Sequence, residues 1–228
     1  MLQKETLKFL NDLKLNNNKE WFSDNRKRYD KAKADYLGLA GTLLGEMKKH
    51  DPSLDILTPK DCIFRINRDI RFSADKSPYK TNLGIVLHPG GKKSNLSAYY
   101  LHIEKGQSFV GGGLYMPDAA ALAKVRKEIH YFYHDLKSVL QQHDFKNTFG
   151  DLSIEDKQKL SRPPKGYEAT DPAIEYLKLK SFTAFQTLDD DMLTSDKLVP
   201  KVIESFKVIQ PLLHFINRGL LSDPNGGL

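Results

Sequence analysis

The sequence predicts an α+β fold in which long amphipathic helices cover an antiparallel β-sheet meander. Before residue 50 and after residue 117, apolar side chains recur at steps of three or four, the period of a helix with one buried face. Between residues 61 and 115 the period changes to the alternation that β-strands show. We expect residues 1–220 to form a single α+β domain and residues 221–228 to form a polar tail.

Two helices are expected ahead of the sheet. Leu7, Leu10 and Leu13 mark one face of a first helix. The asparagines at positions 16–18 should end this helix, because asparagine favours caps and turns. A longer helix is predicted over residues 19–49, where the apolar residues again fall on one stripe.

Four short strands follow in the alternating region. They are predicted at Cys62–Asn67, Leu83–His88, Ala98–Glu104 and Ser108–Tyr115. The Pro-Gly-Gly sequence at 89–91 and the Lys-Gly pair at 105–106 are turn signals, so consecutive strands should pair in antiparallel order. The glycines at 111–113 lie inside the last strand, where glycine indicates a bulge or a close approach of another backbone or ligand. We expect a bulge that lets a helix pack closely.

Helices return after the sheet. A third long helix is predicted over residues 117–140, with Asp118 as its N-cap. A short helix is expected after Gly150. Residues 173–186 indicate a brief helix that passes into a further strand, and the chain closes on an amphipathic helix over residues 202–217.

The composition is that of a globular chain. Of 228 residues, 39% are hydrophobic and 28% are charged, and the formal net charge is +6. This excess allows attraction to phosphates or anionic surfaces, but it fits ordinary solubility equally well. The lone Cys62 excludes an internal disulfide and indicates a reducing compartment. With no leader pattern and no long apolar run, secretion and membrane spanning lack support, so we expect a cytoplasmic location.

The densest chemistry lies in residues 64–84, which we call the basic segment. Its cations and one tyrosine are predicted to bind an anionic ligand, together with an arginine from a proline-stiffened loop. The predicted ligand-binding residues are Arg65, Arg68, Arg71, Lys76, Tyr79, Lys80 and Arg162. Arginine binds carboxylate or phosphate through two parallel hydrogen bonds, and hydroxyl groups add neutral donors. Asp69 and Asp75 could equally tie these cations into a structural network that holds the loop.

The candidates for acid–base catalysis are His102 and Glu104, which lie two residues apart in a predicted strand and so share one face. His130 and His134 are one helical turn apart, a spacing that suits two metal ligands. No third ligand is apparent, and both histidines are expected at the border of a helix. No metal is therefore predicted. No cofactor is predicted either, because the glycines match neither a phosphate-binding loop nor a dinucleotide fingerprint.

Five sequence blocks resemble those of a known family. In chain order they are NNNKEWFSDNRKRY, FRINRDIRFSADKSPYKTN, YYLHI, SFVGGGLYMP and RPPKGY. Their order and spacing over residues 2–217 resemble the bacterial and fungal family of conserved hypothetical proteins called domain of unknown function 2461. The resemblance implies a single α+β unit, and it carries over no catalytic or binding residue.

The predicted function is binding of a phosphorylated or otherwise anionic ligand at the basic segment. Three alternatives stay open: an enzyme that uses the same segment with His102 as acid or base, a structural or protein-interaction domain, and a protein that binds single-stranded nucleic acid. A small anion is the first partner expected and nucleic acid the second, with no membrane partner.

Overall fold

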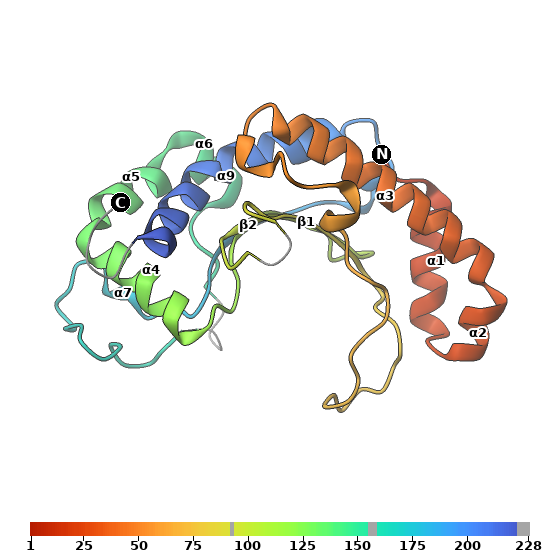
Figure 1. The fold of residues 1–228 in the computed structure, drawn as a ribbon, viewed down its shortest axis with the longest axis horizontal. Coiled ribbons are helices and arrows are strands. Elements are labelled where there is room, and N and C mark those ends of the chain that lie inside the picture. Colours follow the sequence, from red (N-terminus) through yellow and green to blue (C-terminus); the bar gives the residue numbers. More distant parts are fainter. Residues whose placement is uncertain (92–93, 155–158, 223–228) are drawn as a thin grey trace. The chain divides into compact units, whose positions relative to one another are not determined.

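The computed structural model describes residues 1–91, 94–154 and 159–222 (Figure 1). Helices and a four-stranded antiparallel sheet make up this part of the chain, so the predicted α+β class is confirmed. The α-helices are α1 (Lys4–Leu15), α2 (Lys19–Asp24), α3 (Arg26–Lys48), α4 (Ala119–Tyr131), α5 (Tyr133–Gln141), α6 (His143–Phe149), α7 (Ile174–Leu177), α8 (Asp190–Leu193) and α9 (Leu198–Leu221). Two short 3-10 helices, η1 (Pro52–Leu54) and η2 (Pro59–Cys62), follow α3.

The sheet has the order of a meander. Its strands are β1 (Leu83–Leu87), β2 (Ala98–Ile103), β3 (Phe109–Leu114) and β4 (Phe182–Thr187), paired in the order β1-β2-β3-β4. Three of them fall where the alternation predicts strands, and β4 follows α7 as expected for residues 173–186.

The strand predicted at Cys62–Asn67 is wrong. Cys62 ends η2, and the residues after it make two isolated antiparallel bridges, Ile63 with Ile85 and Asn67 with Tyr79. Residues 63–67 are extended, which explains their alternating side chains. Their bridging partner changes from β1, at Ile85, to the residues just before β1, at Tyr79. No continuous ladder therefore forms within the described residues.

Two predicted long helices are each divided in the structure. The helix predicted over residues 19–49 is interrupted at Asn25, between α2 and α3. The Asn25 backbone leaves the helical region, with φ −100° and ψ 14°. Its side-chain amide donates to the Trp21 carbonyl oxygen at 2.9 Å and accepts from Arg28 Nη1 at 2.9 Å, which holds the residue between the two helices. The helix predicted over residues 117–140 is divided at Phe132, whose backbone leaves the helical region.

The glycines of β3 confirm a close approach of another backbone, but that backbone belongs to the neighbouring strands. A Cβ atom on Gly111 would lie 2.0 Å from the Ala184 carbonyl oxygen, and one on Gly112 would lie 2.4 Å from that of Ala98. The expectation that these glycines let a helix pack closely is therefore wrong. Any side chain here would collide with the backbone of β2 or β4.

The chain divides into two compact units. Unit 1 comprises residues 1–87, 100–110 and 187–204, and unit 2 comprises residues 88–99, 111–186 and 205–228. Their boundaries fall within β2, β3, β4 and α9. The single domain over residues 1–220 stays a prediction, and the polar tail lies almost wholly outside the described residues. Within the described residues, no helix is both long enough and apolar enough to cross a membrane.

In unit 1, α1 lies beside α3 (Figure 1). The buried residues of α3 include Tyr36, Ala40, Leu43 and Met47, spaced at three or four positions as the predicted stripe requires. The asparagines between α1 and α2 make caps: Asn16 donates to the Asp12 carbonyl oxygen, and Asn18 accepts from the Trp21 amide, each at 2.9 Å. The predicted end of the first helix is confirmed.

In unit 2, an arginine near the end of α9 ties this helix to α4 and α5. Arg218 forms ion pairs with Glu128 and Asp135, and its guanidinium lies over the Phe132 ring at 4.7 Å. At the start of α4, Asp118 accepts a hydrogen bond from the Ala121 amide at 2.8 Å, which confirms the predicted N-cap. The short helix expected after Gly150 falls partly on residues 155–158, outside the described residues.

Candidate anion-binding site

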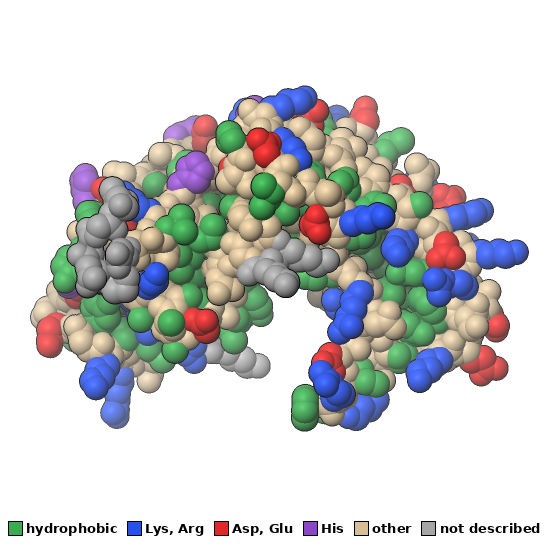
Figure 2. Space-filling model, in the orientation of Figure 1, with side chains coloured by type: hydrophobic (Ala, Val, Ile, Leu, Met, Phe, Trp, Pro, Cys, Tyr) green, Lys and Arg blue, Asp and Glu red, His purple; other side chains and the backbone are tan. Residues whose placement is uncertain are grey.

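The centre of the basic segment folds as a paired arm in unit 1, the gold loop of Figure 1. We call residues 66–80 the basic arm. Its two sides are joined by hydrogen bonds from the Lys80 amide to the Ile66 carbonyl oxygen at 2.8 Å and from the Arg68 amide to the Pro78 carbonyl oxygen at 3.0 Å. Figure 2 shows blue Lys and Arg side chains gathered over this arm and the adjoining helices of unit 1.

An asparagine from the loop between α1 and α2 anchors the arm. The Asn17 side chain donates to the Tyr79 carbonyl oxygen at 2.9 Å and accepts from the Tyr79 amide at 3.1 Å, as a neighbouring strand would do. The Tyr79 ring is buried and stacks on Phe22, with ring centroids 4.0 Å apart and an angle of 16° between the planes. Tyr79 therefore fixes the base of the arm to α2.

Two of the predicted ligand-binding arginines pair with aspartates inside the arm. Arg68 forms an ion pair with Asp75, and Arg71 binds both carboxylate oxygens of Asp69. Hydrogen bonds from Ser77, with the contribution of Arg68, hold the pKa of Asp75 well below its ordinary value. The hydrogen bonds from Arg71 likewise lower the pKa of Asp69. The structural network expected from these aspartates is present.

The outer part of the arm lies outside the two cavities described below. Lys76 donates to the Ile70 carbonyl oxygen at 3.0 Å, and the Arg71 side chain is 76% exposed. Phe72 is 95% exposed, with the Arg71 guanidinium 5.9 Å from its ring centroid. Neither Arg71 nor Lys76 lines the cavities described below.

A cleft of about 440 Å³ lies where the base of the arm meets β1 and β2. We call it the basic cleft. It brings together Arg65, Arg68, Lys80 and His102, four of the residues singled out in the sequence. Its lining is completed by Tyr36, Phe64, Ile66, Asp69, Asn82, Leu83, Gly84 and Tyr100.

Arg65 and Lys80 differ from the paired arginines. Neither forms an ion pair with a carboxylate within the described part of the chain, and the Lys80 ammonium lies 5.1 Å from the centroid of the Phe64 ring. Partial burial and, to a smaller extent, the charge of Arg65 lower the pKa of Lys80. Asp69 is also within electrostatic reach of Arg65, but its carboxylate is held by Arg71. Among the described residues, no ion pair therefore neutralises either of these two cations of the cleft.

His102 occupies the sheet side of the cleft, within a row of polar side chains on one face of β2. Its Nδ1 lies 3.2 Å from the Tyr100 hydroxyl oxygen, and its Nε2 lies 3.4 Å from a carboxylate oxygen of Glu104. The other carboxylate oxygen of Glu104 pairs with Lys14 of α1 at 3.0 Å. The His102 ring also stacks on Phe109, with centroids 4.7 Å apart. The predicted sharing of one face by His102 and Glu104 is confirmed.

Tyr100 and Tyr36 both contact Gly84 in the cleft. A Cβ atom on Gly84 would lie 2.6 Å from the Tyr100 hydroxyl oxygen, so a larger residue at this position would displace the end of the Tyr100 side chain. The Tyr36 hydroxyl donates to the Gly84 carbonyl oxygen. Burial raises the pKa of Tyr36 well above its ordinary value. The helical stripe marked Tyr36 as a core residue, and no pattern in the sequence placed it or Lys14 near His102.

The remaining predicted positions lie in unit 2. Arg162 is exposed on its loop, and its convergence with the basic segment stays a prediction. His130 Nδ1 lies 2.5 Å from an Asp171 carboxylate oxygen. Among the described residues, no group of three or more His, Cys, Asp or Glu side chains is arranged to hold a metal ion.

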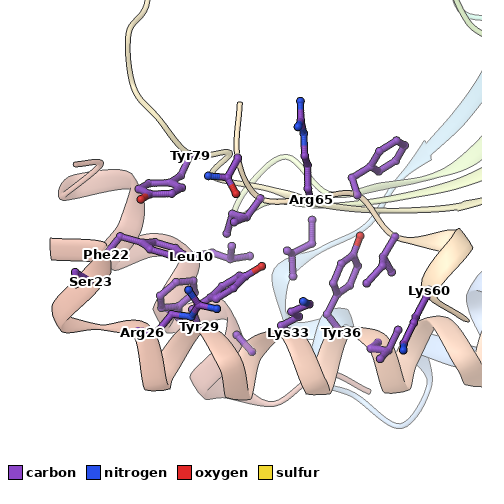
Figure 3. A pocket seen from close by; sticks show the side chains of 18 of the residues that line it. Leu10, Phe22, Ser23, Arg26, Tyr29, Lys33, Tyr36, Lys60, Arg65 and Tyr79 are labelled. Atoms are coloured by element: carbon purple, nitrogen blue, oxygen red, sulfur yellow. The ribbon is translucent and has the colours of Figure 1, made fainter. Parts of the chain in front are cut away.

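A larger cavity of about 810 Å³ lies between α2, α3 and the residues that lead into the arm. We call it the aromatic pocket. In Figure 3, Tyr29 and Tyr36 project from α3, Tyr79 lies against Phe22, and the Arg65 side chain points away from α3. Of these aromatic residues, Tyr79 was predicted to bind a ligand, whereas nothing in the sequence separated Phe22, Tyr29 and Tyr36 from an ordinary core.

Comparison with known proteins identifies a family whose description names no activity. No curated protein and no solved structure matches the chain. A family model described as conserved hypothetical protein, domain of unknown function 2461, matches residues 5–215. The expected resemblance is confirmed, and the chain belongs to this family.

Proposed function

We propose that the basic cleft binds a small phosphorylated or otherwise anionic ligand. The observation that carries the proposal is the pair Arg65 and Lys80, two cations in one cleft without a carboxylate partner in the described residues. An anion placed between them would remove their repulsion and accept charge-assisted hydrogen bonds, which are among the strongest that proteins make.

The surroundings of this pair support the same proposal. Arg68, with 26% of its side chain exposed, is held by Asp75, Ser73 and the Ser77 carbonyl oxygen. A ligand would find this guanidinium already ordered, which lowers the entropic cost of binding. Among the described residues, Asp69 is the one acidic residue that lines the cleft, and its carboxylate is neutralised by Arg71. Repulsion of an incoming anion is thereby reduced.

Calorimetric titration with inorganic phosphate tests the proposal. Lys80→Met removes the charge and keeps an unbranched apolar side chain against Phe64, and Arg65→Gln removes the guanidinium. Each should weaken phosphate binding about 10-fold or more, because a hydrogen bond to a charged group contributes roughly 1.5–3 kcal/mol. Lys27→Met is the matched control, since Lys27 is exposed in unit 1 and lines neither cavity. Unchanged affinity in Lys80→Met and Arg65→Gln, or an equal loss in Lys27→Met, would rule out the cleft.

An acid–base enzyme is the second candidate. It is favoured by the position of His102, which lies between the Tyr100 hydroxyl and Glu104 and lines the same cleft as the two cations. A histidine held by a carboxylate can exchange a proton with a neighbouring hydroxyl or a bound ligand. If a panel of nucleotides and sugar phosphates includes a substrate, His102→Ala should abolish its conversion and leave its binding in place. Turnover that persists in His102→Ala would remove His102 from the mechanism.

Single-stranded nucleic acid is an alternative anionic partner. The exposed Phe72 beside Arg71 at the outer end of the basic arm favours it, because bases stack on aromatic rings next to cations. Binding of an oligonucleotide that weakens steeply with added salt and is lost in Phe72→Ala would support this partner. Binding unaffected by Phe72→Ala would exclude the arm as a stacking platform.

A further inference from the structure

The basic cleft and the aromatic pocket share a wall in unit 1. Five residues line both cavities, namely Tyr36, Phe64, Arg65, Ile66 and Leu83. The cavities therefore meet along the extended residues that lead into the arm. A ligand bound in one of them would lie next to residues that also line the other.

The aromatic pocket has the chemistry of a site for a ring. The aromatic residues that line it are Phe9, Phe22, Tyr29, Tyr36, Phe64 and Tyr79. Apolar side chains such as Leu10 and Leu37 complete its inner surface, and Lys19, Arg26, Lys33, Lys60 and Arg65 supply its charges. No Asp or Glu lines the pocket among the described residues. Planar rings bind such surfaces by stacking and by burial of apolar area, and the cations favour a negatively charged ligand.

The exposure of these residues separates the walls from the rim. Phe22 and Tyr79 are buried and stack on each other, whereas Tyr29 is only partly buried and meets Phe22 with ring centroids 5.0 Å apart. Burial raises the pKa of Tyr29, as expected for a phenol with an apolar side. Tyr29 therefore offers ring surface to a ligand, and Lys33 lies one turn further along α3 at the exposed rim.

We infer that the ligand of the basic cleft carries a planar apolar ring, and that this ring lies in the aromatic pocket while the anionic group lies between Arg65 and Lys80. This inference rests on the proposed function. The volumes of about 810 and 440 Å³ each fall within the range of small-molecule sites. The chemical class is an organic phosphate with an aromatic or heteroaromatic ring.

A comparison of two probes, inorganic phosphate and phenyl phosphate, tests the ring. By calorimetry, phenyl phosphate should bind the parent protein about 10-fold more tightly than inorganic phosphate, since stacking and burial of one ring are worth roughly this factor. Tyr29→Leu should remove most of this preference and leave the affinity for inorganic phosphate unchanged. Tyr131→Leu, at an exposed tyrosine of unit 2, is the matched control and should keep the preference.

A second variant guards against a change in folding. Ser23 is an exposed residue of the pocket lining, so Ser23→Trp adds bulk at the rim without removing a buried group. It should lower the affinity for phenyl phosphate alone. Equal binding of the two probes by the parent, or a preference that survives both Tyr29→Leu and Ser23→Trp, would overturn the inference while the anion site stands. If neither inorganic phosphate nor phenyl phosphate binds the parent protein, the proposed function is overturned and this inference with it.

Discussion

At the residue scale, the aspartates of the basic arm divide its cations into two groups. Arg68 and Arg71 are each paired with an aspartate of the arm, so their charges are already neutralised within the arm. Arg65 and Lys80 at the base of the arm make no ion pair in the described residues. Exposed ion pairs contribute little to stability, so the paired arginines hold the shape of the loop more than they stabilise the fold.

The pKa of Lys80 predicts how anion binding depends on pH. Partial burial and the nearby Arg65 lower this pKa from the ordinary value of 10.5. An anion binds the charged ammonium. Once phosphate is fully in its dianionic form, its affinity should therefore fall as the pH rises through the lowered pKa of Lys80, beginning before pH 10.5. Calorimetric titrations at pH values above the second ionisation of phosphate measure this fall.

The variants used above separate Lys80 from other titrating groups. Lys80→Met should lose this component of the pH dependence, and Lys27→Met should keep it. In the unliganded protein, the same lowered pKa makes the free energy of unfolding increase with pH, whereas the affinity for phosphate decreases. The folded state releases the Lys80 proton before the unfolded state does, so the free energy of unfolding gains a contribution that rises with pH in the same interval. Identical pH profiles for the parent and Lys80→Met would contradict the role of Lys80.

At the scale of elements, β3 depends on glycine for a reason that its alternation does not reveal. The backbone oxygens of β2 and β4 occupy the positions where side chains of Gly111 and Gly112 would begin. Gly113 has a φ of +128°, which other residues rarely adopt. The three glycines therefore permit the pairing of β3 with both neighbours.

Two glycine variants give opposite expected effects on stability. Gly111→Ala places a Cβ atom 2.0 Å from the Ala184 carbonyl oxygen, so it should lower the free energy of unfolding by about 3 kcal/mol or more. Gly38→Ala lies on the exposed side of α3 with no atom within 4 Å, so it should raise that free energy by about 0.5–1 kcal/mol. Urea denaturation of both variants measures the difference. A loss below about 1 kcal/mol in Gly111→Ala would contradict the close approach of β4.

At the scale of the whole molecule, the chain links the two units repeatedly. Each unit is built from three separate segments, and the boundaries fall inside β2, β3, β4 and α9. Neither unit is therefore one continuous stretch of sequence. Separating them by truncation would cut strands that contribute residues to both.

This connectivity predicts a single unfolding transition. Loss of β2, β3 or β4 in one unit would break a strand that continues into the other, so the units should unfold together. Differential scanning calorimetry should then give one peak whose calorimetric enthalpy equals its van't Hoff enthalpy. Two resolved peaks would contradict it and would also remove the prediction that residues 1–220 form one domain.

Local patterns in the sequence determined most elements of this fold. The period of the apolar residues predicted α1, β1, β2, β3 and α9, because helices and strands each place side chains on a face by a rule that is local in the chain. The same patterns joined α2 to α3, because the apolar period does not change at Asn25, where the backbone leaves the helical region. The alternation of apolar residues also led to the wrong prediction of a strand at residues 62–67. Side chains alternate along any extended segment, whether or not it is paired with another strand.

Composition alone identified the basic segment as the site to examine, but pairing in three dimensions decided what its residues do. Nothing local indicated that Arg68 would bind Asp75 while Lys80 made no ion pair with any described residue. Nor did anything local indicate that Asn17 would hold Tyr79, 62 residues away. Such contacts depend on the direction of each side chain after the chain has folded, which neither residue type nor spacing specifies. The tertiary structure thus decided which cations are available to a ligand and placed an aromatic pocket beside them.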